Sequence, residues 1–185
     1  MVNGASSYRR FLEGDDTGIV EIIRDYKDGL ILYLNGITGN IHTAEELMED
    51  TFVKLVTKKP RFSGKSSFKT WLYAIGRNRA VDHMRREKKI SHIPLEESEE
   101  LLKDKRLLEE NYIWETEKIM VHQALEKLKP EYRQILYLKY FEDFSNEQAA
   151  KIMRKSKHQI ENLVYRARLS LKAELEKEGF VYEKL

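Results

Sequence analysis

The sequence contains no cysteine, only three prolines in 185 residues, and no long apolar run. The absence of cysteine excludes disulfide bonds and metal sites built on thiolates. The longest apolar run, Leu30–Leu34, is far shorter than the roughly 20 residues that a membrane-spanning helix needs. The first ten residues, MVNGASSYRR, lack the apolar core of a signal peptide. We therefore expect a cytoplasmic protein with no membrane insertion.

What the chain does contain is typical of helical proteins. Charged residues make up 35% and hydrophobic residues 41%, a composition of soluble, folded chains. At this length there is room for one domain or two small ones. Helical spacing of apolar residues recurs along the chain, and we predict an all-α fold of two small helical domains joined by an acidic linker.

Positive charge is concentrated in residues 61–89, RFSGKSSFKTWLYAIGRNRAVDHMRREKK. Nine lysines and arginines stand there against two acids, although the whole chain has a net charge of only +2. Phe62, Phe68 and Trp71 lie among these cations. Cations suit phosphates and flat rings suit unstacked bases, so the stretch fits a nucleic-acid surface. A helix with a solvated basic face is the alternative.

The rest of the chain is also segregated by charge. Residues 1–60 have seven bases and ten acids, and residues 90–118 have four bases and nine acids. Residues 151–172 have seven bases and one acid. Two basic blocks are thus separated by an acidic segment, which we interpret as a linker over residues 90–112.

The first third of the chain predicts helices. Helical spacing runs from Tyr8 to Leu34, with a capping signal at Asp15-Asp16-Thr17. Asn35-Gly36 and Gly39-Asn40 predict its end and a turn. The sequence TAEE at 43–46 reads as a capping box that opens a second helix, which Pro60 stops. The apolar stripe of that helix consists of Ala44, Leu47, Met48, Phe52, Leu55 and Val56.

The opposite face of the second helix carries Glu45, Glu46, Glu49 and Asp50. A two-metal carboxylate site would need a Glu-x-x-His companion, which is absent. A solvated acidic face and a docking face for a basic partner both remain open on spacing alone.

The basic stretch divides into a loop, 61–67, and a helix that begins near Phe68. The first half of this helix has an apolar stripe formed by Phe68, Trp71, Leu72 and Ile75. Continued at 100° per residue, the same face meets Asn78 and Arg79. A helix that packs with one half and binds a ligand with the other explains this change. For Asn78 a base contact and a satisfied surface amide are both open.

The last third predicts helices over 113–129 and from Pro130, the latter with Ile135, Leu136, Leu138, Tyr140 and Phe141 on its apolar side. Ser145 and Gln148 form a second capping-box match. A break at 154–156 precedes a helix from Ser156 to about Glu178, with Gly179 as its cap.

Two short helices, a tight turn and a basic second helix are the layout of a helix-turn-helix. An ordinary helical hairpin with surface charge is the alternative. Candidate phosphate contacts are Lys155, Lys157, Arg166 and Arg168. Gln159 and Asn162 are candidate base contacts, because amides can bond adenine in a bidentate manner.

Three segments carry a family resemblance: EELMEDTF at 45–52, RFSGKSSFKTWLYAIGRNRAVDHMRR at 61–86, and LKPEYRQILYLKYF, SNEQAAKIM and QIENLVYRAR within 128–168. Together they resemble a bacterial RNA polymerase sigma factor of the sigma-70 family, in the two-domain extracytoplasmic function group. The resemblance covers nearly the whole chain. The chain departs from it at Arg154 and Lys155, where such families usually have a glycine and an apolar residue. It also departs at Glu161 and Leu163, where a basic residue is common in such families.

The resemblance implies three sets of site residues. Residues 1–89 would bind core RNA polymerase and open the −10 promoter element, residues 90–112 would thread the polymerase interior, and residues 113–185 would read the −35 element. Polymerase contacts would come from Glu46, Glu49 and Asp50. The −10 single strand, with one base flipped, would meet Phe62, Lys65, Ser66, Ser67, Arg77, Asn78 and Arg79. Tyr165 joins Lys155, Lys157, Gln159, Asn162, Arg166 and Arg168 as a −35 contact.

On this reading the chain is a transcription initiation factor with no catalytic site, no metal and no cofactor. Its partners are core RNA polymerase and promoter DNA, and the family often adds an anti-sigma factor. A stand-alone helix-turn-helix regulator is the first alternative, but it leaves residues 61–89 unexplained. A metal-dependent nuclease using the acids of 45–50 is the second, and no histidine stands at ligand spacing with them.

Overall fold

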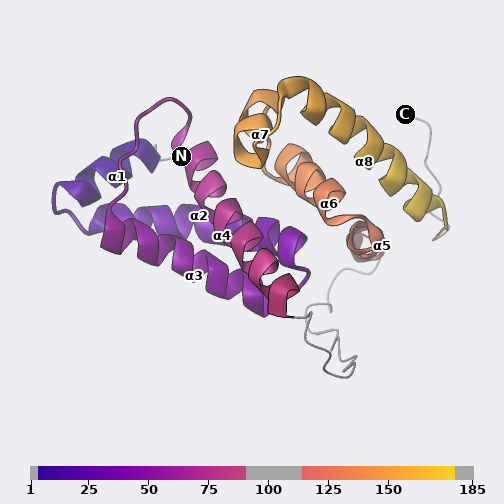
Figure 1. Cartoon of the computed structure of the whole chain (residues 1–185), viewed down its shortest axis with the longest axis horizontal. Helices are drawn as coiled ribbons and strands as arrows, with labels where there is room; N and C mark the ends of the chain where they lie inside the picture. The colour runs from indigo at the N-terminus through magenta and orange to yellow at the C-terminus, as the bar shows by residue number, and fades with distance from the viewer. Residues whose placement is uncertain (1–3, 91–113, 178–185) are drawn as a thin grey trace.

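A computed structural model describes residues 4–90 and 114–177 (Figure 1). In chain order its elements are α1 (Gly4–Leu12), α2 (Thr17–Thr38), α3 (Ile41–Lys58), α4 (Phe68–Ile90), α5 (Trp114–Lys127), α6 (Pro130–Leu136), the π-helical turn η1 (Tyr137–Phe141), α7 (Asn146–Met153) and α8 (Lys157–Lys177). No β-strand occurs within these two ranges, and the predicted all-α fold is confirmed.

The N-terminal half, residues 4–90, is a bundle in which α2 packs against α1, α3 and α4. The C-terminal half, residues 114–177, places α6 and α7 against α8 (Figure 1). Most of the predicted linker and the proposed cap Gly179 lie outside the described residues. No helix in the described part of the chain is long and apolar enough to cross a bilayer.

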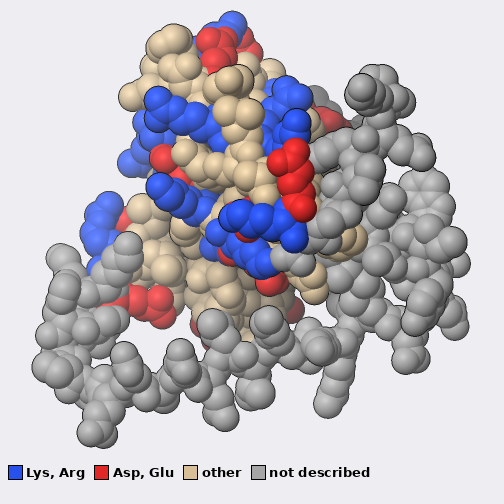
Figure 2. All heavy atoms as spheres, turned by 90° about the vertical axis from the view of Figure 1, so that its right-hand side faces the viewer, with Lys and Arg blue, Asp and Glu red and all other residues tan. Residues whose placement is uncertain are grey.

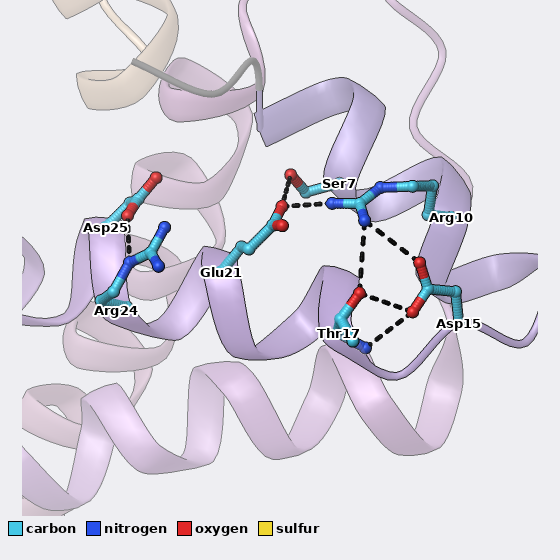
Figure 3. A network of polar contacts seen from close by, with 7 residues as sticks. All are labelled: Ser7, Arg10, Asp15, Thr17, Glu21, Arg24 and Asp25. Atoms are coloured by element: carbon cyan, nitrogen blue, oxygen red, sulfur yellow. Dashed lines mark hydrogen bonds and ion pairs between the residues drawn. The ribbon is translucent and has the colours of Figure 1, made fainter.

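A polar network fixes the corner between α1 and α2 (Figure 3). The Arg10 guanidinium bonds both Glu21 and Asp15, the latter at 3.1 Å, and the Ser7 hydroxyl donates to Glu21 at 2.7 Å. The hydrogen bond from Ser7, followed by that from Arg10, lowers the pKa of Glu21. The network holds the short helix α1 across the first turns of α2.

Two helix boundaries differ from the prediction. The long N-terminal pattern is two helices, α1 and α2, and α2 continues through Asn35-Gly36 to Thr38. It ends at the second of the two predicted signals, Gly39-Asn40, where Gly39 adopts a left-handed φ of 71° and donates to the Asn35 carbonyl. Gly36 stays helical because tertiary packing on Tyr137 overrides its low helix propensity: an added Cβ there would lie 3.5 Å from the Tyr137 ring.

The start of α3 was also predicted incorrectly. Asn40 caps the helix, with its Oδ1 accepting from the Thr43 backbone N–H at 3.0 Å, so Thr43 lies one turn inside. Asn is as good a cap as Thr, and it stands earlier in the chain. Of the predicted apolar stripe, Ala44, Leu47, Phe52 and Leu55 are buried, whereas Val56 is 41% exposed.

The C-terminal helices agree with the prediction up to Leu136, including Pro130 at the start of α6. The helix then changes from α to π geometry in η1, so the side chains no longer follow the 100° spacing of an α-helix. As a result Tyr137 and Leu138 are buried, whereas Tyr140 and Phe141, predicted to face inward, are 55% and 44% exposed.

The helix-turn-helix layout is present in α7 and α8. The capping box of Ser145 and Gln148 forms as predicted. Arg154 ends α7 in a left-handed conformation, φ 54°, which is uncommon for a residue other than glycine. Ile160, Leu163 and Ala167 of α8 are buried, and Val164 and Leu171 are half-buried.

Candidate functional site

The acidic face of α3 points away from the bundle. On a helical projection Glu46, Glu49 and Val53 lie opposite the buried stripe. Val53 is 54% exposed, and both glutamates are exposed. Asp50 lies at the edge of this face, where it pairs with Arg79 of α4 at 2.9 Å. An exposed apolar centre surrounded by charge is the anatomy of a protein interface.

The loop 61–67 is anchored by aromatic packing. Phe62 is half-buried, with its ring 5.6 Å from that of Phe68 and 5.3 Å from that of Trp71. The Tyr8 hydroxyl donates to the Pro60 carbonyl at 2.8 Å, and burial raises the pKa of Tyr8 to about 12. Phe62 therefore fixes the loop on the bundle.

Within the loop, Ser67 caps α4, because its Oγ accepts from the Thr70 backbone N–H at 3.2 Å. The side chains of Lys65, exposed, and Ser66, half-exposed, have no such role. The family resemblance predicted that all four of these loop residues contact the single DNA strand of the −10 element. The structure gives Phe62 and Ser67 a part in holding the loop, and it leaves Lys65 and Ser66 facing solvent.

The polar half of α4 carries three consecutive candidates with different surroundings. The Arg77 Nε donates to the Gln134 Oε1 at 3.3 Å, across to the C-terminal half. Arg79 is held by Asp50. Asn78 between them is half-buried, and its amide has no hydrogen-bond partner among the described residues. Of the three, Asn78 is the side chain that is free to bind a ligand.

Helix α8 begins with a capping box that was not predicted from the sequence. Ser156 donates its backbone N–H to the Gln159 Oε1 at 2.8 Å, and Gln159 donates its own to the Ser156 Oγ at 3.2 Å. The S-x-x-Q spacing was the available signal. The Gln159 amide oxygen is therefore engaged by the backbone in this structure.

The two lysines at the start of α8 are paired within their own half. Lys155 bonds Glu131 of α6 at 2.8 Å, and Lys157 bonds Glu147 of α7 at 2.5 Å. The hydrogen bond from Lys157 lowers the pKa of Glu147 to about 2. The basic charge of residues 151–172 is therefore partly neutralised by acids of the preceding helices α6 and α7.

The exposed side of α8 presents the remaining candidates. Asn162, Tyr165 and Arg166 lie on one face at helical spacing, and Tyr165 is 66% exposed. Arg168 is exposed on the flank. Arg166 and Arg168 have no ion pair in the described part of the chain. Leu169, 51% exposed, continues the face of Tyr165 and was not predicted.

A shallow groove of about 310 Å³ lies between α6 and α8. It is lined by Glu131, Tyr132, Lys155, Gln159, Asn162, Leu163 and Arg166. Four of the seven −35 candidates therefore share one concavity. Figure 2 looks onto the side of the molecule on which α5 and α8 lie, and lysines and arginines spread over that face with acids among them.

The residues do not suggest a metal site. Among residues 4–90 and 114–177, no group of three or more His, Asp or Glu side chains converges.

Comparisons with known proteins give a consistent result. Residues 22–90 match the pattern of sigma-70 region 2, and residues 118–171 match that of sigma-70 region 4. The RNA polymerase sigma factor YlaC of Bacillus subtilis (strain 168) is 32% identical over 160 residues, which cover 86% of this chain and 92% of the relative. The extracytoplasmic function sigma factor SigW of the same organism is 24% identical, over 88% and 91%.

Two solved structures resemble the fold. One is the sigma factor RpoE in complex with the anti-sigma factor NepR from Bartonella quintana, with a TM-score of 0.64, 26% identity and coverage of 84% of this chain and 95% of that one. The other is CnrH in complex with the cytosolic domain of CnrY, with a TM-score of 0.64, 20% identity and coverage of 95% and 96%.

Proposed function

The chain belongs to the extracytoplasmic function group of the bacterial sigma-70 family, and from this premise we propose how its residues share the work of a sigma factor. The protein acts with RNA polymerase in promoter-specific transcription initiation. The observation that carries this function is the presence of both regions, 2 and 4, in order along one chain.

Residues 1–89 form the unit that docks on core polymerase and opens the −10 element, and residues 113–185 form the unit that reads the −35 duplex. Residues 90–112 connect them. Joining two modest DNA binders raises their joint affinity, because the second binding event becomes intramolecular.

Glu46, Glu49 and Asp50 of α3 make the polymerase contact. Support comes from their exposure around Val53, since such a face fits a basic, partly apolar surface. The contact leaves the bundle core unchanged, because the stripe that packs on α2 and α4 is on the other side of α3.

The −10 single strand follows the loop 61–67 and the polar half of α4. Lys65 and Ser66 reach the strand directly, and Phe62 and Ser67 hold the loop in place. Asn78 contacts a flipped base with its unpartnered amide. Flipping costs a few kcal/mol, which new hydrogen bonds and stacking must recover. Arg77 and Arg79 lie on either side and attract phosphates.

The −35 duplex binds along the groove between α6 and α8. Asn162, Tyr165 and Arg166 enter the major groove, and Arg168 meets the backbone from the flank. Lys155, Lys157 and Gln159 contribute once DNA phosphates compete with their present partners.

Sigma factors are not themselves catalysts, and the chemistry of RNA synthesis takes place on the polymerase. We propose that the chain works in the cytoplasm, where its polymerase and promoters are. We also propose an anti-sigma partner, because the similar solved structure of RpoE contains one.

Run-off transcription tests the function directly. Core polymerase is mixed with the purified chain and genomic fragments, and start sites are mapped. We expect discrete starts that depend on the chain, with a shared sequence upstream. Random starts at the level of core alone would contradict the function.

Glu147 is predicted to restrain −35 binding. Glu147→Gln releases Lys157 to bind a phosphate, so we expect about threefold tighter binding of a −35 duplex and a salt dependence steeper by about one counterion. Fluorescence anisotropy across a salt series measures both.

The control for this prediction introduces Glu147→Gln into a chain that already carries Lys157→Gln. In Lys157→Gln, the further change Glu147→Gln removes the same charge but has no lysine to release. An equal gain in both backgrounds would mean that Glu147 repels DNA directly, and the ion pair would then have no part in the effect.

A stand-alone helix-turn-helix regulator is not favoured. It would account for residues 118–171 alone, whereas residues 22–90 match a second sigma region. A pull-down with core polymerase separates the two functions, because a regulator has no need of the acidic face of α3.

A further inference from the structure

The two halves of the chain pack directly on each other. Helices α2 and α4 of the N-terminal half contact α6, η1 and α7 of the C-terminal half (Figure 1). At the centre, the ring of Phe144 meets that of Tyr73 edge-on at 5.1 Å, and both side chains are almost fully buried. The Lys69 ammonium lies 4.9 Å from the Phe144 ring centre. The contact is as closely packed as a protein core.

Glu142 makes the polar part of this contact. Its carboxylate accepts from the Tyr73 hydroxyl at 2.7 Å and pairs with the Lys69 ammonium at 2.8 Å. Lys69 also donates to the Glu142 carbonyl at 3.0 Å. The Glu142 side chain is only 13% exposed. Burial, followed by the charge of Glu142, raises the pKa of Tyr73, so the hydroxyl remains a donor.

Gly29 of α2 provides the space for this carboxylate. A Cβ at position 29 would lie 2.6 Å from the Tyr73 hydroxyl and closer than van der Waals contact to the Glu142 Oε1. Gly29 is in the interior of a helix, where glycine is less favourable than alanine. Because Gly29 has no side chain, the carboxylate of Glu142 from the other half can lie against α2.

The backbone around Glu142 aims its side chain at α4. The Glu142 N–H, just after η1, donates to the carbonyl of Tyr137, the first residue of η1, and the Phe144 N–H donates to the Leu138 carbonyl at 2.9 Å. Asp143 between them has a left-handed φ of 54°. This tight turn sends Glu142 and Phe144 to the same neighbour, while Asp143 stays exposed.

The packed arrangement cannot read a whole promoter. The −35 and −10 elements are named by their positions along the promoter, so they lie about 25 base pairs apart. This separation is roughly 85 Å along B-form DNA. Two domains of this size in contact have centres roughly 35 Å apart, given a radius of gyration of about 13 Å for 100 residues. The halves must therefore separate when both elements are bound.

The packed arrangement also engages the proposed −10 site. Arg77 is bonded to Gln134. Lys151 of α7 donates to the Lys65 carbonyl at 2.9 Å, which holds the loop 61–67 against α7. Separation of the halves releases both groups.

We propose that Glu142 and Phe144, seated against Gly29, Lys69 and Tyr73, form a latch that holds the free chain closed and that opens when polymerase and promoter bind. This proposal rests on the proposed function for the meaning of the open state. The closed state itself is a property of the chain alone.

Single-molecule energy transfer tests the latch. The chain has no cysteine, so Lys27→Cys and Ala173→Cys, both at exposed positions, place one dye on each half of the full chain. We expect the free chain to be mainly in a high-transfer state. Gly29→Ala displaces Glu142, and Glu142→Gln removes its charge. Each should raise the low-transfer fraction at least about fivefold.

Asp143→Asn is the matched control. It removes the same charge one residue away, and asparagine tolerates the left-handed backbone. We expect its transfer histogram to be that of the unchanged chain. Gly29→Ala and Glu142→Gln should both keep the helical circular-dichroism spectrum of the unchanged chain, because each half has its own buried core. Opening with unchanged helix content is the result that a damaged fold does not produce.

Two outcomes overturn the latch: a free chain that is mainly in the low-transfer state, or Gly29→Ala and Glu142→Gln histograms equal to that of Asp143→Asn. The proposed function fails separately, if the unchanged chain supports no promoter-dependent run-off transcription. A closed free chain that opens in Gly29→Ala would then still establish the latch.

Discussion

Replacing Glu46 and Glu49 by lysine is expected to lower the affinity for core RNA polymerase by more than about 100-fold. Close charge pairs at protein interfaces have coupling energies of about 1.5–7 kcal/mol, and the variant converts two attractions into repulsions. Each tenfold change in affinity corresponds to about 1.4 kcal/mol. Surface plasmon resonance with immobilised core measures the loss.

Asp50 is left unchanged in this variant, because it also holds Arg79. Reversing Asp50 would disturb the proposed −10 site together with the docking face. Glu46 and Glu49 are exposed, with no partner among the described residues, so their replacement tests docking alone. Glu13→Lys makes the same substitution at an exposed site between α1 and α2, and it should change the affinity less than about threefold.

The fold of the double variant is expected to remain intact. Exposed substitutions away from caps and ion networks usually change the free energy of unfolding by about 0.5 kcal/mol or less. A double variant that unfolds normally and still binds core at wild-type affinity would rule out α3 as the docking face.

Asn78→Ala is expected to reduce the fraction of promoter that is melted at −10 by about 10- to 100-fold, while binding to core polymerase stays within about twofold. A lost hydrogen bond to an extruded base corresponds to about 1–3 kcal/mol. Permanganate reactivity of unpaired thymines measures the melted fraction.

The same substitution on the other half is the matched control. Asn162→Ala removes an exposed amide from α8, the proposed −35 contact, so it should weaken −35 duplex binding while leaving core binding unchanged. When the promoter is saturated with the complex of core polymerase and the Asn162→Ala chain, −10 melting should recover. The same saturation with the Asn78→Ala chain should not restore melting. Equal losses of melting and core binding in Asn78→Ala would assign Asn78 a role in folding.

Much of the fold was predictable because the signals are local. Helical spacing, the Ser145–Gln148 capping box and Pro130 each act within a few residues, and each was confirmed. The boundaries that were predicted incorrectly depend on contacts that are distant in sequence. Asn35-Gly36 is a turn signal taken alone, yet Gly36 packs on Tyr137, a hundred residues away, and the helix continues.

The site shows the same division. The chemical nature of the residues near α4 and α8, cations with amides and aromatics among them, is visible in the sequence. Their availability is not. Only the folded chain pairs Lys155 with Glu131, Lys157 with Glu147 and Arg79 with Asp50. In the described part of the chain, these pairs leave six DNA-contact candidates whose side chains have no partner: Lys65, Ser66, Asn78, Tyr165, Arg166 and Arg168.

By itself, the sequence determined the helices, the basic stretch at 61–89 and the family, because short-range spacing and residue type decide these. The tertiary structure decided which charges are already satisfied and how the halves meet. Glu142 has no spacing relation to Gly29 or Tyr73, and nothing local marks it as a buried acid. Its surroundings exist only once α2 and α4 pack on the turn after η1, since burial and pairing are properties of the assembled chain.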